Sequence, residues 1–213
     1  NRKTFQYYGY RSMRHNIIGD NCVMSVLKGE DGNLFIGTDK DGLYILDEKG
    51  EVIKHLSPNN WGNYFPSSIL SMCIDSEGEL WVGTALKGLA KVDIQSGKVT
   101  TFKELDGIQV NAIVQVKEKL YLGTQGSGLY SLNLENNLIL KCERYNNGVN
   151  DELPNKWINS LFRDKDGKLW IGHSKGVTCF DPNKNSFLAY GNKNIIIHDC
   201  ICYSIMEDYN GDI

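Results

Sequence analysis

The chain has 213 residues, of which 41% are hydrophobic and 23% are charged, a balance that excludes a disordered chain and allows a packed core. The formal net charge is −3, and Lys and Arg are scattered along the sequence without clusters, so we expect no nucleic-acid partner. No apolar run approaches the roughly 20 residues that span a bilayer, so we expect no membrane contact by this chain.

A four-part unit recurs in register along the chain. It consists of an aliphatic run, a turn, a Leu-aromatic-aliphatic-Gly-Thr segment and a second apolar segment that opens with Gly. The period of ~40–50 residues is typical of a repeat architecture. The glycine of the central segment stands at Gly37, Gly83, Gly123 and Gly172.

Each unit is predicted to form four short antiparallel strands, of which the first two are joined by an Asp-Gly or Glu-Gly turn in three of the four units. Four strands every ~40–50 residues are typical of a β-propeller blade, so the predicted fold class is all-β. Cover by neighbouring blades on both faces explains why the second and third strands are almost continuously apolar. The four complete blades are predicted at about 22–57, 68–103, 109–146 and 157–191.

The two ends of the chain are predicted to hold partial blades. Residues 4–8 resemble the last strand of an earlier unit, and residues 200–213 begin a fifth unit. We therefore expect residues 1–213 to be a single fragment of a larger propeller. Terminal blades of such a fragment expose apolar faces, which favours self-association. The repeat glycines, together with Trp81 and Trp170, are predicted core residues.

The residues show no catalytic or metal-binding pattern. The four histidines lie far apart in the sequence, and no Gly-x-Ser-x-Gly segment is present. Residues 39–42 and 164–167 contain acidic pairs, but both segments are too short for a calcium loop and are interpreted as turns. The six cysteines form no C-x-x-C pair and are interpreted as mostly small buried hydrophobic residues. We therefore predict no catalytic residue, no metal and no cofactor.

The second and fourth units, Ile69 to Asp93 and Ile158 to Asp181, carry the sequence Asp-x-x-Gly-x-Leu-Trp-aliphatic-Gly followed by Gly-aliphatic-x-x-x-Asp in nearly complete form. This pattern resembles the two-component regulator propeller repeat, and the resemblance covers nearly the whole chain. The chain departs from this pattern in several places: Phe35 and Tyr121 replace Trp, and His173 replaces Thr. The first unit also lacks the acid after its first strand, and the third unit lacks the Asp-Gly turn.

The resemblance implies a periplasmic sensor region of the kind found in Bacteroides-type hybrid two-component system histidine kinases, which carry seven-bladed propellers and detect oligosaccharides. It implies that this fragment is not an enzyme and that the kinase domain lies outside these residues. Two alternatives stay open: a structural or dimerisation scaffold without a ligand of its own, and a propeller lyase.

Ligand contacts in propellers come from the loops between the second and third strands and from the connections between blades. Trp61 and Tyr64 are the most suggestive residues, because an aromatic ring can cover the apolar face of a pyranose. For Trp61 the alternative is packing inside its own loop, and Trp157 is interpreted as a core residue. The other candidate ligand-binding residues are polar and lie in the same loops: Asn59, Asn60, Asp151, His173, Lys175 and His198.

Overall fold

The structure is a computed structural model that describes residues 18, 22–61, 65–136, 138–142, 153–188, 197–198 and 200–213. The predicted partial strand at residues 4–8 lies outside the described residues, as do Tyr64 and Asp151. For Trp61 and His198, only the backbone is described.

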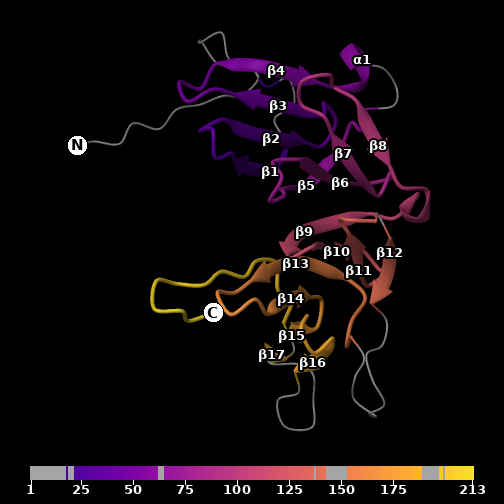
Figure 1. Cartoon of the computed structure of the whole chain (residues 1–213), viewed down its shortest axis with the longest axis vertical. Helices are drawn as coiled ribbons and strands as arrows, with labels where there is room; N and C mark the ends of the chain where they lie inside the picture. Colours follow the sequence, from indigo (N-terminus) through magenta and orange to yellow (C-terminus); the bar gives the residue numbers. More distant parts are fainter. Residues whose placement is uncertain are drawn as a thin grey trace. The chain divides into compact units, whose positions relative to one another are not determined.

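The described residues form four sheets in which successive strands are hydrogen-bonded neighbours, so that each sheet is an antiparallel meander (Figure 1). This arrangement confirms the predicted fold class of four complete, four-stranded antiparallel blades. The strands of the first sheet are β1 (Val23–Lys28), β2 (Leu34–Thr38), β3 (Leu43–Leu46) and β4 (Val52–Leu56). Those of the second sheet are β5 (Ile69–Ile74), β6 (Leu80–Thr84), β7 (Leu89–Val92) and β8 (Val99–Thr101).

The third sheet consists of β9 (Val110–Val116), β10 (Lys119–Thr124), β11 (Leu129–Asn133) and β12 (Ile139–Cys142). The fourth consists of β13 (Ile158–Arg163), β14 (Leu169–His173), β15 (Gly176–Asp181) and β16 (Ser186–Leu188), with β17 (Ile197–His198) on the free part of β15. The helices of the described residues are α1 (Pro58–Trp61) and the 3-10 turn η1 (Lys103–Leu105). No helix in the described part of the chain has the length and hydropathy that a membrane crossing requires.

The turn between the first two strands explains the Asp-x-x-Gly-x-Leu-Trp pattern of the second and fourth units. Asp164 accepts a hydrogen bond from the backbone N–H of Lys168 (2.8 Å) through one carboxylate oxygen and from the indole Nε1 of Trp170 (2.8 Å) through the other. Asp75 and Trp81 form the same pair at 2.7 Å. Because both oxygens of Asp164 serve the hairpin, the turn interpretation of residues 164–167 is confirmed.

The repeat glycines Gly37 and Gly123 are packed against the first strand of the following blade. A Cβ on Gly37 would approach the side chain of Ile69 to 2.7 Å, and a Cβ on Gly123 would approach Ile158 to 2.5 Å. Contacts this short exclude a side chain, so these positions require glycine. Gly172 packs in the same way against Cys202, where a Cβ would lie 2.8 Å from the sulfur.

The chain divides into two compact units, described here separately. Unit 1 comprises residues 1–84 and 90–101 and contains the first two sheets; unit 2 comprises residues 85–89 and 102–213 and contains the others. The core of unit 1 is aliphatic around Phe35 and Phe65. The core of unit 2 is built around Phe180, whose ring centroid lies 5.9 Å from that of Tyr121 and 5.1 Å from that of Phe187.

Three sequence-based expectations need correction. Trp157 is 51% exposed, so its assignment to the core is wrong. Cys179 is buried, but Cys22 and Cys200 are exposed, so burial does not describe the cysteines as a group. Residues 200–213 contain no regular strand, although they form the expected turn with a hydrogen bond from Asp208 N to Asp212 O (2.8 Å). No second strand among the described residues pairs with this segment, and strand geometry requires such a partner.

Candidate functional site

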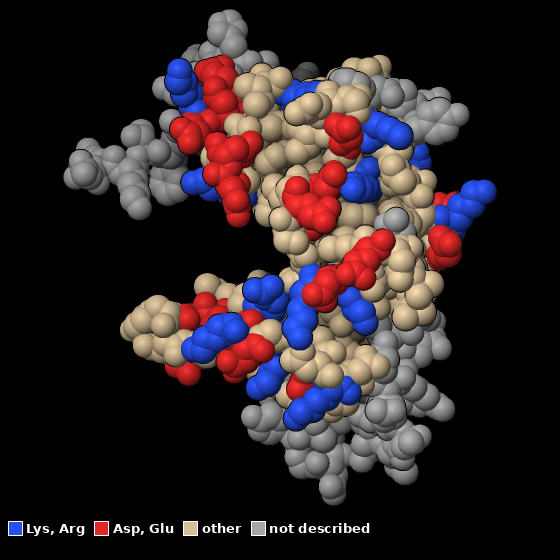
Figure 2. Space-filling model, in the orientation of Figure 1, with Lys and Arg blue, Asp and Glu red and all other residues tan. Residues whose placement is uncertain are grey.

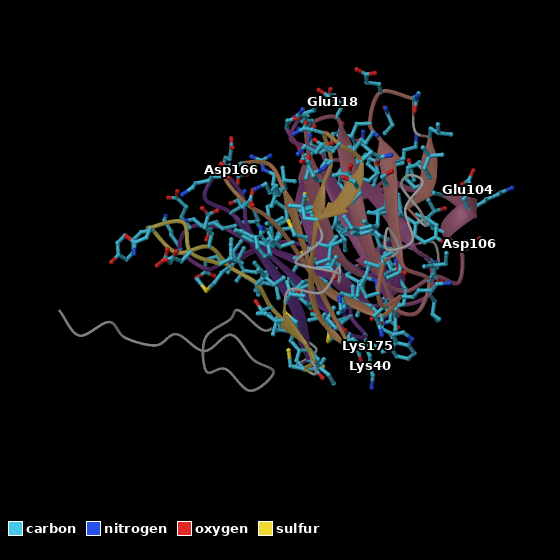
Figure 3. The ribbon with its side chains drawn as sticks, turned by 90° about the horizontal axis from the view of Figure 1, so that it is seen from below. Lys40, Glu104, Asp106, Glu118, Asp166 and Lys175 are labelled. Carbon is cyan, nitrogen blue, oxygen red and sulfur yellow. The ribbon has the colours of Figure 1, made fainter. Side chains whose placement is uncertain are left out.

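Each blade has two ends, and the loops at these ends differ in composition. Within unit 2, Figure 3 shows Lys175, from the β14–β15 loop, at one end, with Glu118 and Asp166 toward the other end. Glu118 and Asp166 belong to turns between first and second strands, whereas the Lys175 end holds the loops between second and third strands and the connections between blades. We call the latter the loop end of each unit. On the face that Figure 2 shows, acidic and basic side chains are interspersed on both units.

The loop end of unit 1 is organised around His55. The His55 ring stacks on Tyr44, with ring centroids 3.9 Å apart and planes 10° from parallel. His55 Nε2 lies 2.8 Å from the carbonyl oxygen of Asp41 and 3.4 Å from its carboxylate oxygen Oδ1. The Tyr44 hydroxyl donates to the other carboxylate oxygen of Asp41. These three side chains therefore bind mainly one another.

Asn60 is also engaged inside unit 1. Its Oδ1 accepts hydrogen bonds from the backbone N–H (2.7 Å) and the hydroxyl (3.0 Å) of Ser57, while its Nδ2 donates to the carbonyl oxygen of His55 (2.9 Å). Ser57 stands directly before Pro58, the first residue of α1. Serine before the helix, proline at its first position and an amide reaching back from the third position form a capping arrangement. Asn60 thus stabilises the helix on which Asn59 and Trp61 stand.

The loop end of unit 2 is organised around Trp157. The backbone N–H groups of Gly126 and Gly128 both donate to the carbonyl oxygen of Lys156, at 3.0 and 3.1 Å. On its other side, Trp157 accepts a hydrogen bond from Ser174 N at its carbonyl oxygen (3.1 Å). The backbone at Trp157 is therefore fixed between the β10–β11 loop and the β14–β15 loop, while its indole is half exposed.

His173 is fully buried at the base of this loop end. Its Nε2 lies 3.0 Å from Oγ1 of Thr178, and its Nδ1 accepts a hydrogen bond from the backbone N–H of Lys175 (3.1 Å). Burial, assisted by the positive charge of Lys175, lowers the pKa of His173 to about 4, so the ring is neutral near pH 7. His173 therefore holds the β14–β15 loop from inside the protein. The prediction that its side chain contacts a ligand directly is wrong, because the side chain is fully buried.

In blades 1 and 3 the position of His173 is occupied by threonine. Thr38 and Thr124 donate their hydroxyl groups to the carbonyl oxygens of Gly42 (3.0 Å) and Gly128 (2.6 Å), four residues further on. The loop after His173 is one residue shorter than the loops after Thr38 and Thr124. His173 bonds instead to the backbone N–H of Lys175 and to the hydroxyl of Thr178. The substitution that departs from the repeat pattern is thus explained by a shorter loop.

The structure brings some of the predicted site residues together. Lys175 is exposed in the β14–β15 loop directly above His173, and His198 pairs with Gly176 through β17, so the three stand at the loop end of unit 2. Asn59 is exposed on α1 in unit 1, beside Asn60. Trp61 ends the same helix.

Trp157 is the residue that the sequence analysis missed. Its equivalents, the residues directly before the first strands of the other blades, are Cys22, Ser68 and Gln109. The polar residues Ser68 and Gln109 at the matching position are a signal that could have placed Trp157 at the surface. Among the described residues, no group of three or more His, Cys, Asp or Glu side chains could hold a metal ion.

The fold is that of β-propeller blades, and comparison with known proteins supports this class. The β-propeller domain of Cps50 (Swd1) from Myceliophteria thermophila superimposes with a TM-score of 0.64, at 14% identity, over 89% of this chain and 61% of that domain. The extracellular domain described as that of a hybrid two-component system from B. thetaiotaomicron gives a TM-score of 0.64, at 23% identity, over 83% of this chain and 23% of that one.

Two segments of the chain match a known repeat family. Residues 63–85 and 152–175 match the family described as two component regulator propeller. A curated relative, histidine kinase P4 of Formosa agariphila, is 26% identical over 165 residues, which are 74% of this chain. The chain spans only 12% of the length of that relative.

Proposed function

We propose that this chain is a ligand-sensing propeller segment of a two-component signalling protein, that it acts in the periplasm and that its ligand is an oligosaccharide. The match of two blades to the two-component regulator propeller repeat carries this proposal. The similarity to a histidine kinase and to an extracellular sensor domain supports it. In the proposed protein, catalysis belongs to a kinase domain outside these residues, and the propeller segment supplies recognition.

In this proposal, recognition takes place at the loop ends of the blades. Strands of the blades are occupied with packing, because Leu43, Leu80, Leu120 and Leu169 are fully buried. The loop ends carry the exposed Trp157 and Lys175 in unit 2 and the helix α1 in unit 1. Loops on a rigid scaffold are the usual carriers of binding residues.

The test is binding of the purified chain to a panel of neutral and acidic oligosaccharides of plant, algal and host origin. A ligand at 100 times its Kd stabilises the folded state by about 2.7 kcal/mol, which raises the melting temperature of a chain of this size by roughly 5–10 °C. We expect one saccharide class to produce such a shift, confirmed by calorimetry. A flat response to every member of the panel contradicts the proposal.

A scaffold that self-associates is a second candidate, favoured by exposed apolar residues on β1. Val26 is 58% exposed, whereas its equivalent in the second blade, Met72, packs against the core of unit 1. The scaffold hypothesis predicts a dimer or larger species in light scattering that Val26→Lys dissociates. The sensor hypothesis predicts instead that Ala at Trp61 and Tyr64, or at Trp157, weakens saccharide binding without changing the oligomeric state.

A further inference from the structure

The loop end of unit 2 presents an aromatic ring on a fixed backbone. Hydrogen bonds on both sides of Trp157, to Lys156 O from the β10–β11 loop and from Ser174 N to Trp157 O, hold its position. The bond from Gly126 N to Lys156 O is part of an isolated antiparallel bridge between Gln125 and Trp157. A half-exposed tryptophan whose backbone is held in this way loses little conformational freedom when a ligand stacks on it.

One side of the indole lies over a glycine. A Cβ placed on Gly126 would lie 3.5 Å from Nε1 of Trp157, at van der Waals distance, and Gly126 has φ +87°. The β10–β11 loop therefore supports the ring without covering it with a side chain. The remaining exposed part of the ring is an apolar surface surrounded by polar loops, which is the arrangement that the C–H face of a pyranose contacts.

The charged residues of the described segments that meet at Trp157 have one sign. The three segments that meet at Trp157 are residues 124–128, 153–157 and 173–176, and their charged residues are Lys156 and Lys175. Both lysines are exposed, and both belong to backbones that the same hydrogen bonds fix. The buried His173 adds no charge near pH 7 but holds the backbone N–H of Lys175.

We propose that Trp157, Lys156 and Lys175 form a subsite for an acidic saccharide, in which Trp157 stacks on the sugar ring and the lysines bind a carboxylate or sulfate substituent. Gln125 and Ser174 belong to two of the segments that meet at Trp157, and in the proposed subsite they bond sugar hydroxyl groups. The inference deepens the proposed function and rests on it, because it names the class of saccharide and the residues that bind it.

The experiment measures the Kd of the full chain by calorimetry for three probes: an oligogalacturonate, a sulfated carrageenan oligosaccharide and a neutral xylo-oligosaccharide. The first two separate a carboxylate from a sulfate ligand, and the third reports stacking alone. We expect one acidic probe to bind about tenfold or more tightly than the neutral probe. We also expect its affinity to fall with added salt, because exposed charges are screened.

The variants separate stacking from charge. Trp157→Ala should weaken the acidic probe about tenfold or more, and Trp157→Phe should retain affinity within roughly threefold, because a smaller ring still stacks. Lys156→Gln and Lys175→Gln should each weaken it about three- to tenfold and reduce its salt dependence. Lys184→Gln, a matched removal of one positive charge in the β15–β16 turn, should leave the affinity unchanged.

The outcomes distinguish this inference from the proposed function. If a saccharide binds and Trp157→Ala leaves its Kd unchanged, the subsite is wrong while saccharide sensing stands. If the neutral probe binds as tightly as both acidic probes, the assignment to acidic saccharides is wrong. If neither these probes nor the wider panel bind the wild-type chain, both proposals are contradicted. Circular dichroism of each variant checks that the fold is intact.

Discussion

The loop ends of the two units are built on the same type of strand but use their side chains differently. In unit 1, Tyr44, His55 and Asp41 bind one another, and Asn60 caps the helix that follows. In unit 2, Trp157 and Lys175 are exposed. The internal bonds there are made by the backbone and by the side chains of Thr124, Asn155 and His173. The same repeat pattern of strands therefore carries two kinds of loop end. One is a closed cluster of polar side chains, and the other is an exposed surface.

Among the tests of this difference, the largest expected effect is the change that His173 causes in the free energy of unfolding as the pH varies. Its pKa is about 4 in the folded chain and about 6.5 in the unfolded chain, so between these values the unfolded state binds more protons. The free energy of unfolding should therefore fall as the pH is lowered from 6.5 to 4, by up to about 3 kcal/mol from this residue.

Urea denaturation of wild type and His173→Thr at several pH values measures this contribution. Threonine is the residue at the equivalent positions Thr38 and Thr124, and it has no group that titrates in this range. As the pH falls, the free energy of unfolding of the wild type should thus decrease more than that of the variant. Parallel pH profiles would show that His173 is not held neutral by burial.

The next effect concerns the helix cap in unit 1. Asn60→Ala removes the acceptor of the Ser57 N–H and the donor to His55 O, and loss of such a cap costs about 1–2 kcal/mol. Asn59→Ala is the matched control, because Asn59 is exposed on the same helix, and surface substitutions of this kind change stability by about 0.5 kcal/mol or less. Equal destabilisation by the two variants, measured by urea denaturation, would refute the cap.

A smaller loss is expected for Tyr44→Phe. The variant keeps the ring that stacks on His55 but removes the hydroxyl that donates to the Asp41 carboxylate, so the expected cost is about 1 kcal/mol. Tyr209→Phe removes a hydroxyl from a side chain that is 95% exposed and serves as the control. A Tyr44→Phe chain as stable as wild type would mean that the cluster in unit 1 contributes no stability through this bond.

The smallest effect is expected at the loop end of unit 2. Lys175→Gln should change the free energy of unfolding by about 0.5 kcal/mol or less, because the side chain is exposed and the bond to His173 comes from the backbone N–H. The same denaturation series measures it. A loss as large as that of Asn60→Ala would show that Lys175 is a structural residue, and the contrast between the two loop ends would disappear.

The four-stranded blades could be predicted because their signals are local. An Asp that binds both the turn and the indole, as Asp164 does with Trp170, leaves a fixed spacing in the sequence. The tight packing at Gly123 leaves an equally clear signal, since only glycine fits beside Ile158. The Asp–Trp bond recurs in the second and fourth units, and the tight glycine contact recurs in the first, third and fourth units. Recurrence in register distinguishes both interactions from chance.

The candidate site was harder to predict. The sequence named candidate residues in the loops, but His173 among them is buried, and Trp157, interpreted as core, is exposed. Whether a loop side chain bonds internally depends on the partner that the fold brings near it, such as Ser57 for Asn60 and Thr178 for His173. Whether an aromatic residue beside a strand is covered depends on the neighbouring loops, and Gly126 has no side chain to cover Trp157.

The sequence by itself determined the strands, their order and the turns between them, because hydrophobic pattern, turn residues and close backbone contacts act over a few residues and repeat with each blade. Only the tertiary structure decided which polar and aromatic side chains of the loops are engaged within the protein and which face solvent. That choice depends on distances between segments far apart in the chain, as between Trp157 and Ser174, and these distances exist only once the strands have assembled.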